Sequence, residues 1–361
     1  MENRIENLRK IMAAENVELL AIGPGAHMQW LLGFHPHGDE RPCLFCLSAE
    51  HAAFLMPALN AEGSRVHTEL PFYEWADEVG PVPAFETLLN DFGATGAKTV
   101  VLDETMRADF AALVQDALPD AARRFTETTL GALRQRKDDA EYALLKANAR
   151  IADQAMKAAW AEMAEGMSET DVVQIIRASF ASNGAKPLFH IVGAGGNGAF
   201  PHHQSGARKL ARGDAVVMDI GGGKDGYSSD ITRMAVIGTA PDGYEEVHRV
   251  VDRAVQAALA AARPGVKAKE VDRAARTVIA DAGYGDYFVH RTGHGLGVEV
   301  HEPPYLTSVS ETVLETGMVF SIEPGIYLPD RFGIRLEEIV ILREDGPEIL
   351  SDLPRDLKVI G

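Results

Sequence analysis

The chain has 361 residues, of which 46% are hydrophobic and 24% are charged, so its composition is that of a folded globular protein and not of a disordered or fibrous one. Domains usually hold about 100 to 200 residues, and this length therefore predicts two of them. Acidic residues outnumber basic residues by 53 to 35, and a formal charge of −18 repels a phosphate backbone, which argues against nucleic acid as a partner.

The first twenty residues mix charged and apolar side chains in an amphipathic pattern, without the apolar core of an export signal. No run of about 18 apolar residues occurs elsewhere, so the sequence predicts no membrane span and a cytoplasmic location. Cys43 and Cys46 form a CxxC within an apolar run, but there is no second cysteine pair to complete a zinc site. We expect two buried thiols in a strand, with redox chemistry as the less favoured alternative.

The region before residue 131 alternates helical and extended patterns, which predicts a small α/β layer. The helical and apolar runs cover residues 4–15, 17–22, 52–56 and 100–102. Periodicity is lost after Phe125, and the segment from Arg134 to Asp139 is strongly charged. We therefore expect an exposed connection there, with a domain boundary near residue 130.

A long helix is predicted from Asp139, and a second helix begins at Ser168, whose hydroxyl would cap it opposite Asp171. Apolar runs of strand length follow at residues 189–192, 215–220 and 234–237. The same order then returns, with helical patterns at residues 244–262 and 267–282 followed by more strand patterns.

The second series repeats the first at individual positions. The segment from Gly166 to Val172 resembles that from Gly265 to Val271 in its glycine, acidic and valine positions. The further matches pair His190, Gly193 and Gly195 with His290, Gly293 and Gly295, and Leu210, Gly213, Asp219 and Gly221 with Leu314, Gly317, Glu323 and Gly325. A period near 100 residues does not fit solenoid units, so we infer two fused half-domains around a pseudo-twofold axis, whose shared cleft gathers acids from both halves.

Four acids and one histidine lie in or beside these apolar patterns. Asp219 ends the run Ala-Val-Val-Met, and Asp230 precedes another strand after a glycine-rich reversal, so both carboxylates are expected at strand edges facing one point. Glu323 follows a mostly apolar run and Glu337 lies inside the last strand pattern, where an unpaired carboxylate is expensive to bury. His294 lies between glycines that permit close backbone approach.

Each of these residues alone has an ordinary structural explanation, such as a turn, a cap, or a salt bridge to Arg233 or Arg335. For four acids and one imidazole together, a shared metal pair is the better explanation. Such hard ligands match manganese, cobalt or zinc and not thiolate-bound metals. Two ions about 3.5 to 4 Å apart would share one water and lower its pKa towards roughly 7, which makes hydroxide available at neutral pH.

These residues resemble the pita-bread metallopeptidases, family M24, which include methionine aminopeptidase, aminopeptidase P and prolidase. The resemblance covers Arg134 to the C-terminus and rests on five motifs in the family's order, namely Asp219, Asp230, Gly-His294-Gly, Glu323-Pro-Gly and Arg335-Leu-Glu337. The preceding region looks like the N-terminal domain of aminopeptidase P, prolidase and creatinase, which methionine aminopeptidases generally lack. This favours the branch that acts on proline peptides.

The resemblance implies an α/β (α+β) fold, with a creatinase/prolidase-like domain over residues 1–130 and a pita-bread catalytic domain over residues 131–361. It implies hydrolysis of the peptide bond before proline, as an Xaa-Pro aminopeptidase or an Xaa-Pro dipeptidase, and a homodimer. Two divalent metal ions per chain are expected, manganese first, with cobalt, zinc or iron as alternatives. By the same resemblance Asp230 and Glu337 bridge the ions, Asp219 binds one of them, and His294 with Glu323 binds the other.

The family pattern also implies roles around the metals. His202, His290 and His301 would line the substrate cleft. Of these, His202 and His290 would contact the substrate backbone around proline. His301 would stabilise the oxyanion, and Glu323 would relay a proton to the departing proline nitrogen. Arg335 would orient a ligand carboxylate.

Other candidates are less specific. Tyr227 and Tyr327 are expected either to pack or to hydrogen-bond near the metals. His35, His37 and Arg41 resemble a family loop that can approach a neighbouring subunit's cleft, and an ordinary solvated loop is the alternative.

The substrate stays open at this point, because Met234 replaces the threonine that often follows the Thr-Arg pair in prolidases. One alternative keeps the metals and acts on a small nonpeptide solute, as a hydrolase or lyase. Another is a metal-free, creatinase-like or binding protein, against which the complete ligand set argues. The loops do not separate a dipeptidase from an aminopeptidase.

Overall fold

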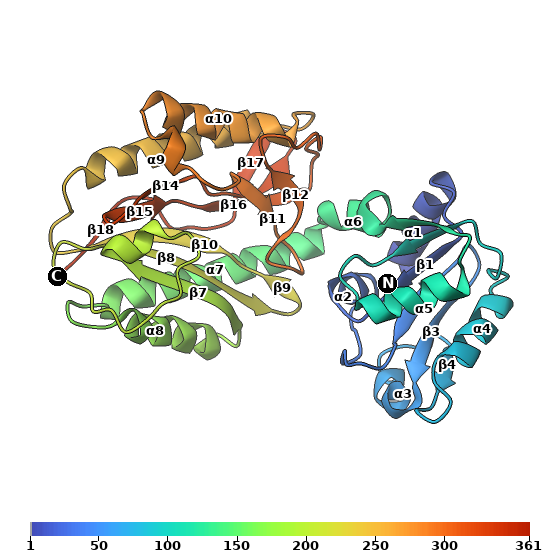
Figure 1. Ribbon diagram of the computed structural model, residues 1–361. Helices are drawn as coiled ribbons and strands as arrows, with labels where there is room; N and C mark the ends of the chain where they lie inside the picture. The colour runs from blue at the N-terminus through green and yellow to red at the C-terminus, as the bar shows by residue number, and fades with distance from the viewer. Residues whose placement is uncertain (1) are drawn as a thin grey trace. The chain divides into compact units, whose positions relative to one another are not determined.

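The computed structural model describes residues 2–361 and divides into two compact units, Met1–Arg134 and Gln135–Gly361. Each unit builds helices around mixed or antiparallel sheets, blue to cyan in the first and green to red in the second (Figure 1). No helix in the described range is both long and apolar enough to cross a lipid bilayer.

The first unit holds one six-stranded sheet in the order β4-β3-β2-β1-β5-β6. Its elements are α1 (Glu2–Ala14), β1 (Leu19–Ile22), α2 (Ala26–Leu32), β2 (Leu44–Leu47), β3 (Ala52–Pro57), α3 (Ala58–Arg65), β4 (Phe72–Trp75), α4 (Val82–Asp91), β5 (Thr99–Leu102), α5 (Ala108–Ala117), β6 (Ala122–Phe125), the 3₁₀ helix η1 (Thr126–Thr128) and α6 (Leu130–Gln135). The predicted helix and strand runs of this region all appear. Strands β1 and β5 are parallel, whereas β1 and β2 are antiparallel.

The two cysteines are buried and unpaired, Cys43 just before β2 and Cys46 within it. Burial raises the pKa of both thiols, to about 12 at Cys43, so they stay protonated at neutral pH. This agrees with the expected structural role.

The connection after Phe125 is helical and only partly exposed, which corrects the expectation of an exposed, irregular segment. Instead of an irregular linker, the chain forms η1 and α6, and Leu130 is fully buried. Two charged residues of the segment are buried because each has a partner: Arg134 donates to His27 Nδ1 at 3.0 Å, and Lys137 pairs with Glu302 at 2.7 Å. Arg136, Asp138 and Asp139 are exposed, as expected. Charge alone misled the prediction, since paired charges can be buried.

The second unit contains two larger sheets and a two-stranded ribbon. Its elements are α7 (Asp139–Glu162), α8 (Glu169–Ser182), β7 (Lys186–Ala194), η2 (Gly195–Ala199), β8 (Ala215–Lys224), β9 (Tyr227–Ser228), β10 (Ile231–Ile237), α9 (Tyr244–Ala261), α10 (Ala268–Asp281), η3 (Gly285–Tyr287), β11 (Gly293–Gly295), β12 (Glu302–Leu306), β13 (Val319–Ile322), β14 (Gly325–Leu328), β15 (Phe332–Arg335), β16 (Glu338–Arg343), β17 (Gly346–Ile349) and β18 (Lys358–Ile360). The sheets run β18-β10-β8-β7, with β9 beside β8, and β12-β11-β13-β16-β17, while β14 pairs with β15.

The predicted internal repeat is present in the hydrogen bonds as well as in the order of elements. Gly166 N donates to Leu210 O at 2.8 Å, and Gly265 N makes the same bond to Leu314 O at 2.8 Å. The two glycines have φ of 85° and 87°, left-handed values that glycine adopts without the Cβ penalty. Helices α7 and α8 with β7, β8 and β10 thus correspond to α9 and α10 with β11, β13 and β16.

The helices begin where the sequence predicts. Asp138 and Glu141 form a capping box at the start of α7, and Ser168 and Asp171 form the predicted one at the start of α8. Left-handed Gly184 follows the end of α8.

Strand β8 is buried on both faces. Val216, Met218 and Ile220 pack in the core that contains α7 and α8, whereas Ala215 and Val217 pack in the core that contains α9, α10 and the second sheet. Side chains alternate along a strand, so the next residue on the second face is Asp219. The fold therefore points this acid from the first half towards the second.

Candidate metal centre

Asp219 lies in the middle of β8 and not at a strand edge, which corrects one expectation. The strand continues through the glycine-rich segment to Lys224, because glycines there let neighbours approach: a Cβ at Gly221 would lie 2.1 Å from the Phe189 ring. The carboxylate is exposed to the cavity between the two halves and not to bulk solvent at a turn.

The predicted reversal between the two first-half acids is a two-residue hairpin. Lys224 pairs with Tyr227, and the intervening Asp225 and Gly226 have φ of 55° and 81°. Positive φ at both central residues is the signature of a type I′ turn, whose twist matches that of the strands. Asp230 then lies just before β10, as expected.

His294 occupies the centre of the short strand β11, and its tautomer is fixed. Its Nδ1 donates to Gly295 O at 3.0 Å, so the lone pair of Nε2 is free for a cation. This Nε2 lies 3.2 Å from Glu323 Oε1 and 3.7 Å from Asp230 Oδ2. Ser321 joins the two strands, because it accepts from His294 N at 2.9 Å and donates to Glu323 at 3.0 Å.

Glu337 does not lie inside the last strand, as the sequence suggested, but at a break between β15 and β16. Thr232 is its partner from the first half, donating to Glu337 Oε2 at 2.9 Å. Thr232 stands opposite Asp219 in the ladder of β8 and β10. This register brings ligand candidates of both halves into contact.

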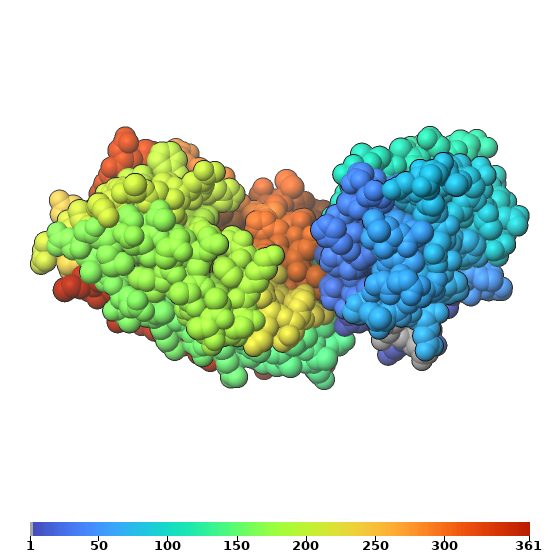
Figure 2. Space-filling view, turned by 90° about the horizontal axis from the view of Figure 1, so that it is seen from below, coloured from blue at the N-terminus to red at the C-terminus, as the bar shows by residue number. Residues whose placement is uncertain are grey.

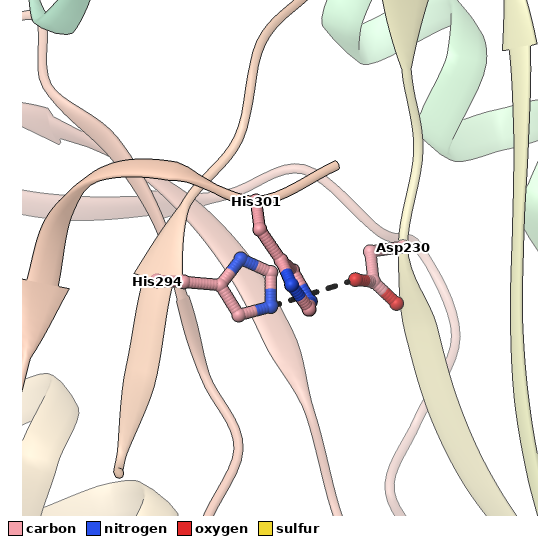
Figure 3. A group of neighbouring side chains, drawn as sticks. All are labelled: Asp230, His294 and His301. Atoms are coloured by element: carbon pink, nitrogen blue, oxygen red, sulfur yellow. Dashed lines mark ion pairs between the residues drawn. The ribbon is translucent and has the colours of Figure 1, made fainter. Parts of the chain in front are cut away.

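The five predicted ligands converge. Their candidate ligand atoms form overlapping groups in which all atoms lie within 4.8 Å of one another, namely Asp219, Asp230 and Glu337; His294, Glu323 and Glu337; and Asp230, His294 and His301. Figure 3 shows the imidazole of His294, from β11, and that of His301, from the segment just before β12, directed towards the Asp230 carboxylate.

Three carboxylate oxygens in this group are buried and accept no hydrogen bond, which is the strongest sign of a cation site. They are Asp219 Oδ1, Asp230 Oδ1 and Glu337 Oε1. Buried polar atoms are nearly always paired, and unpaired carboxylate oxygens converging on one point fit a divalent cation. The donor set, four carboxylates and one imidazole, suits hard or borderline ions.

The pKa values of these acids also favour a cation site. Burial, and then the charges of neighbouring acids, raise the pKa of Asp230 and of Glu337 well above the ordinary range. Burial acts to raise the pKa of Glu323 as well, but the neighbouring His294, His290 and Arg335 outweigh burial and lower this pKa to about 2. Bound cations would hold all the ligands ionised.

Arg335 is the salt-bridge partner that the sequence offered for one acid. Its guanidinium donates to Asp219 Oδ2 at 2.5 Å, to Thr232 Oγ1 at 3.1 Å and to the Tyr327 hydroxyl at 2.8 Å. The other candidate, Arg233, pairs instead with Glu338 at 3.1 Å. Salt bridges therefore compensate part of this cluster and leave the three oxygens above unsatisfied.

Tyr327 connects Arg335 to the cleft. Because it accepts from Arg335, its hydroxyl donates to His290 Nε2 at 2.8 Å, and His290 Nδ1 then donates to Arg291 O at 2.7 Å. Burial lowers the pKa of His290, which keeps the ring neutral in this chain of bonds.

The ligands open onto a cavity of about 1420 Å³ that both halves line. His202, His290 and His301 all line it, and burial followed by the charge of His294 lowers the pKa of His301 to about 4. Figure 2 shows the yellow-green surface of the segments after α8 beside the orange surface near residue 300, the two sides that supply these residues.

The remaining sequence candidates lie elsewhere. Tyr227 donates to Glu141 of α7 at 2.8 Å and packs with apolar residues such as Leu145 and Leu296. His35 and His37 line a separate cavity of about 310 Å³ in the first unit, and Arg41 pairs with Asp77 at 2.9 Å.

Sequence reasoning missed three residues of the site. Thr232 and Ser321 each lie two positions from a ligand acid along an extended segment, so the period of two could have found them. Arg291, between His290 and the glycine-flanked His294, lines the cavity and stacks 4.6 Å from the Tyr305 ring centre. Its position beside a predicted cleft histidine was the available signal.

Comparison with known proteins gives matches over both units. The sequence matches the family model of metallopeptidase family M24 over residues 143–344 and that of the creatinase/prolidase N-terminal domain over residues 4–136. A Pyrococcus furiosus Xaa-Pro dipeptidase is 32% identical over 361 residues, covering 99% of this chain and 100% of the relative. A probable dipeptidase PepE from Mycobacterium tuberculosis is 39% identical over 349 residues, covering 94% and 92%.

Solved structures agree with this. Dipeptidase PepE from Mycobacterium ulcerans matches with a TM-score of 0.94 at 34% identity, covering 99% of this chain and 97% of that one. A prolidase from Thermococcus sibiricus matches with a TM-score of 0.93 at 32% identity, covering 99% of both chains.

Proposed function

Since the chain belongs to metallopeptidase family M24 and is a peptidase, we propose that it hydrolyses the peptide bond preceding proline, using two divalent metal ions. The observation that carries the proposal is the convergence of Asp219, Asp230, His294, Glu323 and Glu337 around three unpaired buried carboxylate oxygens. Manganese is the first candidate, and cobalt, zinc and iron suit the same donors.

Asp219, Asp230, His294, Glu323 and Glu337 would hold the ions. When bound, the ions would supply a hydroxide nucleophile at neutral pH and polarise the scissile carbonyl. Ser321 and Thr232 keep Glu323 and Glu337 in place, since each hydroxyl donates to its acid.

The other residues act on the peptide. His301, neutral at pH 7 because its pKa is about 4, would donate a hydrogen bond to the developing oxyanion. Glu323, ionised at neutral pH, would accept the proton that the attacking hydroxyl group releases and pass it to the departing proline nitrogen. His202 and His290 line the same cavity and would contact the substrate backbone around proline.

Arg291 favours a dipeptide over a longer peptide. It forms no ion pair with any described residue, whereas the other arginine of the cavity, Arg335, is tied to Asp219. A free cation beside the cleft suits the carboxylate that directly follows proline in an Xaa-Pro dipeptide. The curated relative named Xaa-Pro dipeptidase is consistent with this choice. A homodimer and a cytoplasmic location remain predictions from the sequence.

A direct test uses metal-free protein reloaded with each candidate ion. Ala-Pro, Ala-Pro-Ala and Ala-Ala are offered at matched concentrations, and released amino acids are measured. The proposal expects metal-dependent cleavage of Ala-Pro, slower cleavage of Ala-Pro-Ala and little of Ala-Ala. Equal rates on Ala-Ala, or activity after chelation with no bound ion by elemental analysis, would contradict it.

A further inference from the structure

Glu169 is a fully buried acid on the first turn of α8, and it takes no part in the metal cluster. Its Oε1 accepts from Ala194 N and Asn197 Nδ2, both at 2.9 Å. Its Oε2 accepts from Gly206 N at 2.9 Å and from His203 Nε2 at 2.8 Å. Both oxygens are therefore saturated by four donors, which lower the pKa of Glu169 although burial acts to raise it.

All four donors belong to one stretch of chain, residues 194–206, which leaves β7 and returns to α8. This stretch includes Phe200, Pro201 and His202 of the catalytic cavity wall. Apart from η2 it has no regular structure, so few backbone bonds of its own define its path. Glu169 binds this stretch at both of its ends, at Ala194 and Gly206, and also at His203, directly beside His202.

The His202 imidazole itself has no hydrogen-bond partner among the described residues, so its position depends on the backbone that carries it. A buried carboxylate is costly unless its lone pairs are filled, and here charge-assisted bonds fill them. Helix capping does not explain why the Glu169 carboxylate is buried here, because Asp171 and Ser168 already cap α8.

We propose that Glu169 is a positioning residue, which holds the segment 194–206 so that His202 faces the substrate. The inference rests on the proposed role of His202. It adds that the acid acts through this histidine and independently of the metals.

The second half has a comparable anchor. Asp272 of α10 is fully buried and accepts from Thr292 N at 3.2 Å and Thr292 Oγ1 at 2.8 Å, between His290 and His294. The segment that Asp272 holds carries the proposed metal ligand His294, whereas the segment 194–206 that Glu169 holds carries none of the five proposed ligands. Loss of the Glu169 anchor should therefore change substrate handling and leave metal binding alone.

The test compares Glu169→Gln with Asp171→Asn on the same helical turn. Glutamine keeps the shape but turns an NH₂ group towards two donors, whereas Asp171 is exposed and touches only the cap and Lys209. We expect Glu169→Gln to lower kcat/KM for Ala-Pro by about 10- to 100-fold, the scale of a misplaced contact, with manganese affinity by calorimetry unchanged. In Asp171→Asn, both kcat/KM for Ala-Pro and the manganese affinity should stay near the wild-type values.

A double-mutant cycle isolates the route. If Glu169 acts through His202, Glu169→Gln should cost little further activity in a His202→Ala background. The same proportional loss in both backgrounds would overturn the inference, as would full activity in Glu169→Gln. His203→Ala removes one of the four bonds and should give a smaller, equally non-additive loss, which keeps the test available if Glu169→Gln does not fold.

One measurement is independent of the substrate. Histidine-selective ¹⁵N NMR should show the His202 signal shifted or broadened in Glu169→Gln and unmoved in Asp171→Asn. An unchanged His202 signal would overturn the inference. A wild-type enzyme inactive on Xaa-Pro peptides with this NMR response intact would contradict the proposed function alone.

Discussion

Arg335 of the second half donates to Asp219 of the first half at 2.5 Å and so joins the two repeats at the cluster of candidate metal ligands. The same guanidinium also reaches Thr232 and Tyr327, so three of its donors hold residues from three strands. Only a planar, forked cation can serve these directions at once.

Arg335→Lys should therefore weaken metal binding by about 10- to 100-fold, the usual effect of losing a residue that orients a ligand. Lysine keeps the charge but cannot donate to Asp219, Thr232 and Tyr327 together. Isothermal calorimetry with manganese measures the change. Arg343→Lys is the control, because Arg343 pairs with Glu348 away from the cluster. Equal metal affinities of both variants would show that the guanidinium geometry is unimportant.

Glu323→Gln should remove proton transfer while leaving the other ligands in place. General acid–base catalysis contributes about 10²- to 10⁴-fold, so kcat should fall by at least that range at saturating manganese. The bound metal is counted by elemental analysis in the same sample. Wild-type turnover with metal retained would refute the role of this acid. The exposed Glu315→Gln, whose partner is Arg136, serves as the control.

The convergence of the candidate ligands could be predicted because buried acids in apolar strands violate an otherwise regular pattern. Asp230 and His294 lie where the pattern puts them, and the glycine matches predicted the repeat. The environment of Asp219 could not be predicted, since the glycines after it suggested a turn. In the structure these glycines let β8 continue past Asp219 and pack against Phe189.

Two features that the sequence did not reveal depend on partners distant in sequence. Glu302 neutralises Lys137 from 165 residues away, and Glu169 finds its donors after residue 193. Charged residues of this kind are expected to be exposed, because a single sequence does not reveal the distant partner whose charge or hydrogen bonds lower the cost of burial.

Arg291→Met should separate dipeptides from blocked substrates. If its cation binds the carboxylate after proline, the KM for Ala-Pro should rise about tenfold or more, since a charge-assisted bond contributes roughly 1.5–3 kcal/mol. The KM for Ala-Pro amide should change little, because that substrate lacks the charge. Steady-state kinetics on both measure the ratio. The same rise for both substrates would contradict carboxylate binding.

Acid should weaken the first unit through Glu104. Although burial opposes it, hydrogen bonding to His27 and to Thr126 lowers the pKa of Glu104 from 4.5 to about 2. A depressed folded-state pKa gives stability that is fully present above pH 4.5 and is lost as the pH falls towards 2. The side chain is 40% exposed, so solvent screening limits the effect to about 1 kcal/mol or less.

Glu104→Gln should accordingly destabilise the first unit at pH 7 and less at pH 3. Trp30 and Trp75 report on this unit when Trp160 is replaced by phenylalanine, so urea unfolding followed by fluorescence measures it. The exposed Glu127→Gln is the control. A destabilisation that stays constant between the two pH values would mean that the carboxylate charge has no part in it.

Lys137 and Glu302 form an ion pair whose side chains are 1% and 4% exposed, directly beside His301. Lys137→Met should lower the free energy of unfolding of the second unit by about 3–5 kcal/mol, because it removes the cation that pairs with the buried Glu302 carboxylate. Adding Glu302→Leu should recover most of that loss, since a buried ion pair and an apolar pair of similar volume have comparable stability. Trp160 fluorescence in urea measures both variants when Trp30 and Trp75 are replaced by phenylalanine. A single variant as stable as wild type, or a double variant no better than the single one, would show that the pair does not hold this segment.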